Sequence, residues 1–202
     1  MTRTTRSWMA GVILGSSLVG AAPASAQNAP VTTLMVLVDD YVSVSPNILE
    51  RAREETTRIF RNINVEIIWL TRGDARFEDF AVLMSVVSVQ ILSPEMVDRV
   101  KKRESVMGWA APGTRLVKVQ YGGIEALVGE TEALSWIRRE KDIACILGHV
   151  VAHELGHLLL PRGTHSGSGI MQSRLNRQLA ASGGLFFTAS EAQAIRTKLA
   201  TR

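Results

Sequence analysis

With 202 residues, the chain is long enough for one domain built around a single hydrophobic core. A content of 46% hydrophobic and 21% charged residues is that of a globular protein and excludes general disorder. The net charge of +4 falls to +2 if Arg3 and Arg6 leave with a leader, since 21 basic residues then face 19 acidic ones. No basic cluster supports a nucleic-acid partner, so none is expected.

The N-terminus has the pattern of a secretory signal peptide. Arg3 and Arg6 form a basic start, an apolar run follows, and the sequence Ala-Ser-Ala ending at Ala26 offers a cleavage site. The run is too short and too rich in glycine and serine for a convincing membrane span, although an uncleaved anchor is the alternative. We expect a signal peptide at 1–26, a single domain at 27–202, no stable membrane span after cleavage, and a secreted or periplasmic protein.

The first part of the mature chain predicts an α/β unit. Short apolar runs at 33–39 and 65–70 are typical of buried strands. Between them, apolar residues recur at helical spacing over 47–62, with Ser45 as the expected N-cap and Pro46 at the first helical position. The order strand, helix, strand indicates a sheet covered by helices.

The middle of the chain predicts more strands. The β-branched run at 81–92 is long enough for a third strand, and 115–121 alternates apolar and polar residues as a half-exposed strand does. We expect a short helix or an exposed loop at 95–104 and a short extended segment at 107–111. The sheet should therefore contain several strands within an α/β or α+β fold.

Helices dominate the remainder. A helical pattern covers 124–139, and a strongly apolar helix is predicted from about Ile143 to Leu160, where Pro161 and Gly163 end it. The pattern T-x-x-E at 188–191 is a capping box that opens a last helix, ending at about residue 199.

All four histidines lie in the segment CILGHVVAHELGHLLLPRGTHSGSGIM, which ends at Met171. His153 and His157 belong to an HExxH motif, whose spacing places two imidazoles on one helix face as ligands for a single zinc ion. Glu154 then lies beside the metal as a general base for a zinc-activated water molecule. The alternative is a chance match on a buried helix.

A catalytic zinc site needs a third protein ligand, and His165 lies just beyond the turn that ends the helix. Glu191, the only acidic residue after Glu154, is the alternative ligand and also has the position of a cap residue. His149 lies one turn before His153 and is interpreted as a packed or supporting histidine, because a fourth protein ligand would close the metal's coordination sphere.

HELGHLLLPRGTHSGSGIM resembles the metzincin clan of zinc endopeptidases, whose pattern is HExxHxxGxxH followed by a methionine turn. It is most similar to short exported bacterial metzincin-like proteins. The resemblance implies a metzincin-like mixed twisted sheet with an active-site helix and a C-terminal helix. It also implies that Met171 is the methionine beneath the metal and that the segment 107–111 is the edge strand on which a peptide pairs. Two features depart from the pattern: Leu160 replaces its glycine, and His165 follows His157 by eight residues instead of six.

The sequence therefore predicts an exported zinc-dependent endopeptidase with a peptide or protein substrate. Zinc is expected at His153, His157 and His165, with Glu154 as the base. A noncatalytic zinc-binding or peptide-binding module of the same fold, and a zinc amidase acting on a non-peptide amide, are the alternatives that the sequence leaves open.

Overall fold

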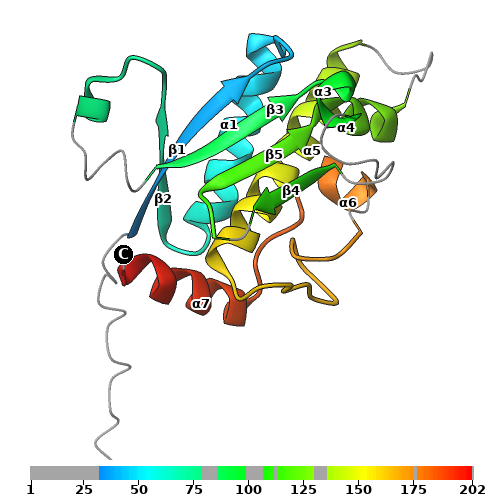
Figure 1. Cartoon of the computed structure of the whole chain (residues 1–202). Coiled ribbons are helices and arrows are strands. Elements are labelled where there is room, and N and C mark those ends of the chain that lie inside the picture. Colours follow the sequence, from blue (N-terminus) through cyan, green and yellow to red (C-terminus); the bar gives the residue numbers. More distant parts are fainter. Residues whose placement is uncertain are drawn as a thin grey trace, which may run out of the picture.

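A computed structural model of the chain describes residues 32–78, 86–98, 107–111, 113–129, 136–174 and 177–201, so the predicted signal peptide lies outside the described residues. The described strands form one sheet in the order β2-β1-β3-β5-β4 (Figure 1). They are β1 (Thr32–Asp40), β2 (Val65–Leu70), β3 (Val87–Leu92), β4 (Gly108–Ala111) and β5 (Leu116–Gln120). Neighbouring strands are parallel except β4, which pairs antiparallel with β5 at one edge. This mixed sheet confirms the predicted fold class.

The strand–helix–strand unit at the start of the described chain also agrees with the sequence. Helix α1 (Pro46–Arg61) begins at Pro46, whose fixed φ angle suits a first helical turn. Ser45 is the N-cap residue, but its side chain makes no capping hydrogen bond; its carbonyl oxygen accepts from the N–H of Leu49 at 3.0 Å. After the helix, Asn64 adopts a left-handed conformation with φ of 58° and turns the chain into β2.

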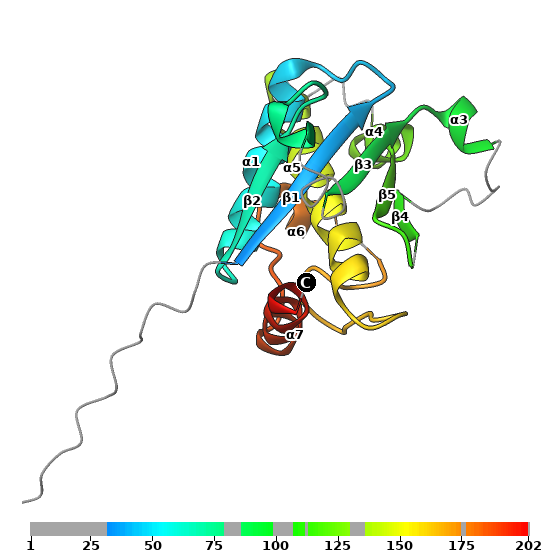
Figure 2. The same ribbon diagram turned by 60° about the vertical axis from the view of Figure 1, so that its left-hand side comes forward.

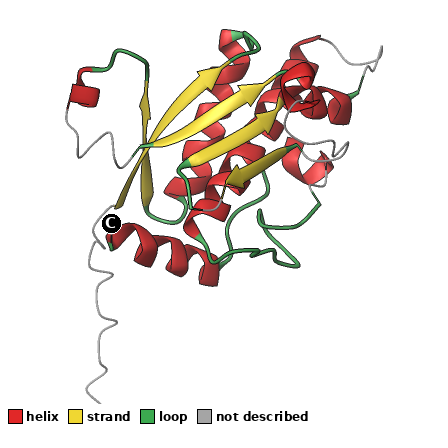
Figure 3. Ribbon diagram, viewed as in Figure 1, coloured by secondary structure: helices red, strands yellow, loops and turns green. Residues whose placement is uncertain are grey.

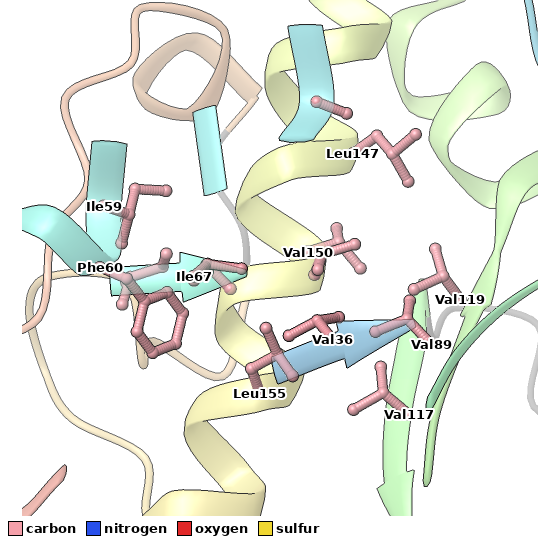
Figure 4. Packing of buried hydrophobic residues seen from close by; sticks show 14 of the residues in the cluster. Val36, Ile59, Phe60, Ile67, Val89, Val117, Val119, Leu147, Val150 and Leu155 are labelled. Carbon is pink, nitrogen blue, oxygen red and sulfur yellow. The ribbon is translucent and has the colours of Figure 1, made fainter. Parts of the chain in front are cut away.

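Two long helices, α1 and α5 (Trp136–Leu159), lie side by side over one face of the sheet, behind it in Figure 1. Figure 4 shows the core that fills the space between these layers. Its labelled side chains come from four strands and both helices: Val36, Ile67, Val89, Val117, Val119, Ile59, Phe60, Leu147, Val150 and Leu155. Removal of this apolar surface from water is the main force that holds α5 against the sheet.

The helical stretch predicted at 124–139 is two separate helices, so that prediction was wrong. Helix α4 (Tyr121–Val128) begins earlier and includes Gly122 and Gly123 in its first turn. It ends at Gly129, whose φ of 76° lies in the region that favours glycine. Helix α5 then begins at Trp136, seven residues before the predicted start. Burial of Tyr121 and Ile124 holds the first turn of α4 despite the low helix propensity of glycine.

The remaining short elements are η1 (Ala75–Glu78), α3 (Pro94–Asp98) and α6 (Arg177–Ala181). Helix α3 is the first part of the segment predicted as a short helix or loop. Of the predicted strand at 81–92, only β3 is a strand among the described residues, and residues 81–85 lie outside them.

Helix α7 (Ala189–Ala200) opens with the predicted capping box. The N–H of Thr188 donates to Glu191 Oε2 at 2.7 Å, and Thr188 Oγ1 accepts from the N–H of Glu191. The helix contacts β1 and α5 and lies below the sheet in both views (Figures 1 and 2). Within the described part of the chain, no helix combines the length and the apolar character needed to cross a membrane.

Candidate metal centre

His153 and His157 lie one turn apart in the second half of α5, as the motif spacing predicts. Their Nε2 atoms are 3.0 Å apart, and their rings meet edge to face with centroids 4.6 Å apart. Nδ1 of His153 lies 2.7 Å from the carbonyl oxygen of Ile170. Since this carbonyl can only accept a hydrogen bond, Nδ1 of His153 carries the proton and Nε2 keeps a lone pair for a ligand.

His165 joins this pair from the loop that follows α5, although eight residues separate it from His157. The N–H and the hydroxyl of Thr164 both donate to the carbonyl oxygen of Pro161, at 3.3 and 2.5 Å, and Gly163 adopts a φ of 73°. This turn accommodates the longer spacing, and the loop then leads on toward α6 (Figure 3). The ring of His165 stacks on that of His153 at 5.6 Å and meets that of His157 edge to face at 4.9 Å.

The three histidines form a donor set that fits a metal ion. Their candidate ligand atoms all lie within 4.8 Å of one another. Two nitrogen ligands of a tetrahedral zinc ion, each at about 2.1 Å, are roughly 3.4 Å apart, close to the distance between the Nε2 atoms. Burial lowers the pKa of His153, and burial with the neighbouring histidines lowers the pKa of His157 to about 4. Both rings are therefore neutral near pH 7, which is the form that binds a metal.

Glu154, next to His153 in the motif, lies against the edge strand β4. The N–H of Ala110 donates to its carboxyl group, and its side chain packs beside Gly108. Burial raises the pKa of Glu154 to about 8, although the Ala110 N–H acts in the opposite direction. Its Oε2 atom is buried and has no hydrogen-bond partner within the described ranges. An unpaired oxygen atom of a carboxyl group can exchange a proton with a bound molecule.

Met171 is fully buried beside α5, where its Sδ atom would lie 2.6 Å from a Cβ atom added to Gly156. Its carbonyl oxygen accepts a hydrogen bond from the N–H of Ser166 at 2.9 Å, and the preceding Ile170 N–H donates to the carbonyl oxygen of Phe186 at 2.8 Å. These bonds hold the loop that carries His165 between α5 and the segment leading to α7. Met171 therefore packs against Gly156 of α5, the residue before His157.

His149 lies apart from the three clustered histidines. It is fully buried, with Nδ1 2.8 Å from the carbonyl oxygen of Cys145 and 3.4 Å from Oε1 of Glu55. Arg58 pairs with Glu55, and the thiol of Cys145 donates to the carbonyl oxygen of Ala180 at 3.0 Å. Glu55, Cys145 and His149 are close enough to hold a metal, but each already has a protein partner. These contacts connect α1, α5 and α6, and His149 is buried among them.

The sequence did not reveal the backbone groups that orient the site, which are the carbonyl of Ile170 and the N–H of Ala110. Backbone groups leave no signature in a sequence. Gly108 did offer a signal, because glycine within a strand often marks a close approach by another group. The alternative ligand Glu191 uses one carboxylate oxygen in the capping box of α7.

Two solved structures are similar to the chain. A zinc-dependent peptidase from Methanocorpusculum labreanum (strain Z) is similar with a TM-score of 0.51 and 13% identity, over 82% of this chain and 99% of that one. Archaemetzincin from Methanopyrus kandleri is similar with a TM-score of 0.47 and 14% identity, over 84% of this chain and 96% of that one. No family model and no curated protein sequence matches the chain. The first likeness establishes a shared fold, and the chemistry is argued below from the site itself.

Proposed function

We propose that this chain is a zinc-dependent peptidase whose metal is held by His153, His157 and His165. The observation that carries the proposal is the convergence of three imidazoles, together with the buried carboxyl group of Glu154, the residue next to His153, which has an unpaired oxygen atom. The fold shared with a zinc-dependent peptidase supports it. When bound, zinc supplies a Lewis acid that polarises a carbonyl group and makes water more acidic.

The protein's own groups have distinct roles in this reaction. In its ionised form, Glu154 accepts a proton from the attacking water through its unpaired Oε2 atom and later delivers it to the leaving amine. The N–H of Ala110 holds the carboxyl group against β4. The carbonyl of Ile170 fixes the orientation of the His153 ring, so that Nε2 is presented with its lone pair free.

The sheet edge beside Glu154 supports an extended peptide or protein substrate. Strand β4 pairs with β5 on one side, and among the described strands it has no neighbour on the other. Its free backbone groups can pair with a peptide by strand addition, which brings a scissile bond close to Glu154. With the leader expected at 1–26, we propose an exported endopeptidase.

A peptide-library digest by residues 27–202 tests this function, with Glu154→Gln as the matched control. We expect about one zinc ion per chain in both proteins and cleavage by the parent alone, since the substitution removes the base and keeps the three ligands. A protein that stays metal-free in zinc-supplemented medium would contradict the site. Zinc binding without any cleavage by the parent would contradict the peptidase activity.

A further inference from the structure

We propose that Gly108 of β4 is a positioning residue that sets the location of the Glu154 carboxyl group. This inference rests on the proposed function of Glu154 as the general base. Gly108 is not among the glycines with a positive φ angle, so its backbone conformation does not demand glycine. The demand comes from the space that Glu154 occupies.

That space is already filled at residue 108. A Cβ atom added there would lie 2.8 Å from Cγ of Glu154, 3.0 Å from its Oε1 atom and 3.1 Å from Cγ1 of Val150. Carbon atoms attract one another best at about 3.5–4.0 Å and repel strongly below that distance. A methyl group at residue 108 therefore displaces the side chain of Glu154 unless the strand or the helix retreats.

Neither element can retreat easily. Antiparallel pairing of β4 with β5 places Gly108 opposite Val119, and the N–H of Gln120 donates to the carbonyl oxygen of Met107 at 2.8 Å. On the helix side, Val150 is 4% exposed and Leu155 is fully buried. The side chain of Glu154 is the movable partner in this contact.

The same strand also supplies the hydrogen bond to Glu154. Ala110 lies two residues after Gly108, and its N–H donates to the Glu154 carboxyl group. Gly108 and Ala110 thus form a binding site for this carboxyl group, called its seat below. Gly108 leaves room for the carboxyl group because it has no side chain, and Ala110 supplies the N–H that donates to it. A methyl group at residue 108 moves the carboxyl group off the seat while His153 and His157 stay on their helix.

Steady-state peptide cleavage by Gly108→Ala tests the consequence for catalysis. Since a misplacement of a catalytic group by about 1 Å can lower the reaction rate roughly 100-fold, we expect kcat to fall by at least about tenfold. KM should change by less than about threefold, because the strand edge stays intact, and bound zinc should remain at the parent level. Gly122→Ala in α4 is the matched control. Its Cβ would meet Cγ of Pro94 at 2.9 Å, which is a similarly close contact, and both residues are remote from the motif in the sequence. A parent-like kcat, or an equal fall in the control, would overturn the proposal.

A second measurement requires no activity. In thermal unfolding of the metal-free protein, Gly108→Ala should lower the midpoint clearly less in the Glu154→Ala background than in the parent, because only the 3.1 Å contact with Val150 then remains. Equal lowering in both backgrounds would show that residue 108 does not set the position of Glu154. If the parent cleaves no peptide, the proposed function fails, whereas this unfolding comparison still decides the placement of Glu154.

Discussion

Replacing Gly156 with alanine should weaken both the fold and the metal site. Gly156 lies one residue before His157, and its added Cβ would meet Sδ of Met171 at 2.6 Å and Cε1 of Phe187 at 3.0 Å. To reach an ordinary contact distance, the sulfur atom must withdraw by about 1 Å. Met171 is fully buried and follows Ile170, whose carbonyl oxygen orients His153. Movement of Met171 therefore shifts the neighbouring carbonyl group of Ile170 and, with it, the orientation of His153.

Two opposing effects set the magnitude of the change in stability. Overpacking of a filled core costs about 1–3 kcal/mol, and exchanging glycine for alanine inside a helix returns up to about 1 kcal/mol. Because the 2.6 Å approach to Met171 is severe, we expect a net loss of about 1–2 kcal/mol in the free energy of unfolding. A disturbed partner of a metal-binding histidine lowers metal affinity by about 10- to 100-fold, and a fall in zinc affinity within this range is expected.

Urea unfolding of the metal-free protein and zinc competition with a chelator measure the two quantities separately. Gly123→Ala is the control, because its Cβ would make only ordinary contacts with Met107 and Gln120, the nearest at 3.5 Å, and it also lies in a helix. This control should leave zinc affinity unchanged and stability equal or slightly higher. If Gly156→Ala binds zinc as tightly as the parent, Met171 adapts by rotation alone and does not support His153.

Three further outcomes are expected elsewhere in the chain. His165→Ala should lower zinc affinity in chelator competition by more than about tenfold. Unchanged zinc affinity would indicate that Glu191 or water is the third ligand instead. Burial raises the pKa of Cys145 from 9.0 to about 11, so iodoacetamide at pH 8 should alkylate it about 100-fold more slowly than a free cysteine. This rate should climb as the pH rises toward 11, and a rate like that of free cysteine would contradict the burial. Thr188→Ala should cost about 1 kcal/mol in urea unfolding, and an unchanged midpoint would show that the cap contributes nothing.

The sequence predicted those features that depend on local patterns. The run VEIIWL coincides with β2, and the capping box locates the start of α7, because both signals lie within the elements themselves. The strand order, with β1 between β2 and β3, depends on contacts between distant segments and could not be read. The early start of α4 was missed because packing of its first turn overrode the low helix propensity of Gly122 and Gly123. Motif spacing identified His153 and His157, whereas the seat of Glu154 on β4 required the fold.

The burial of α5 explains why periodicity alone could not assign a role to each polar residue of the site helix. From Ile143 to Leu159 nearly all of its residues are buried or half-buried, and a helix enclosed on all sides shows no polar face. A buried polar group on such a helix must find a protein partner or bind a ligand, since leaving it unpaired costs free energy. Nδ1 of His149 and of His153 bind carbonyl oxygens, while Nε2 of His149 and Oε2 of Glu154 have no partner in the described chain. His149 lies apart from the three clustered histidines, so under the proposed function Oε2 of Glu154, in the residue next to His153, is the unpaired atom available to a bound ligand.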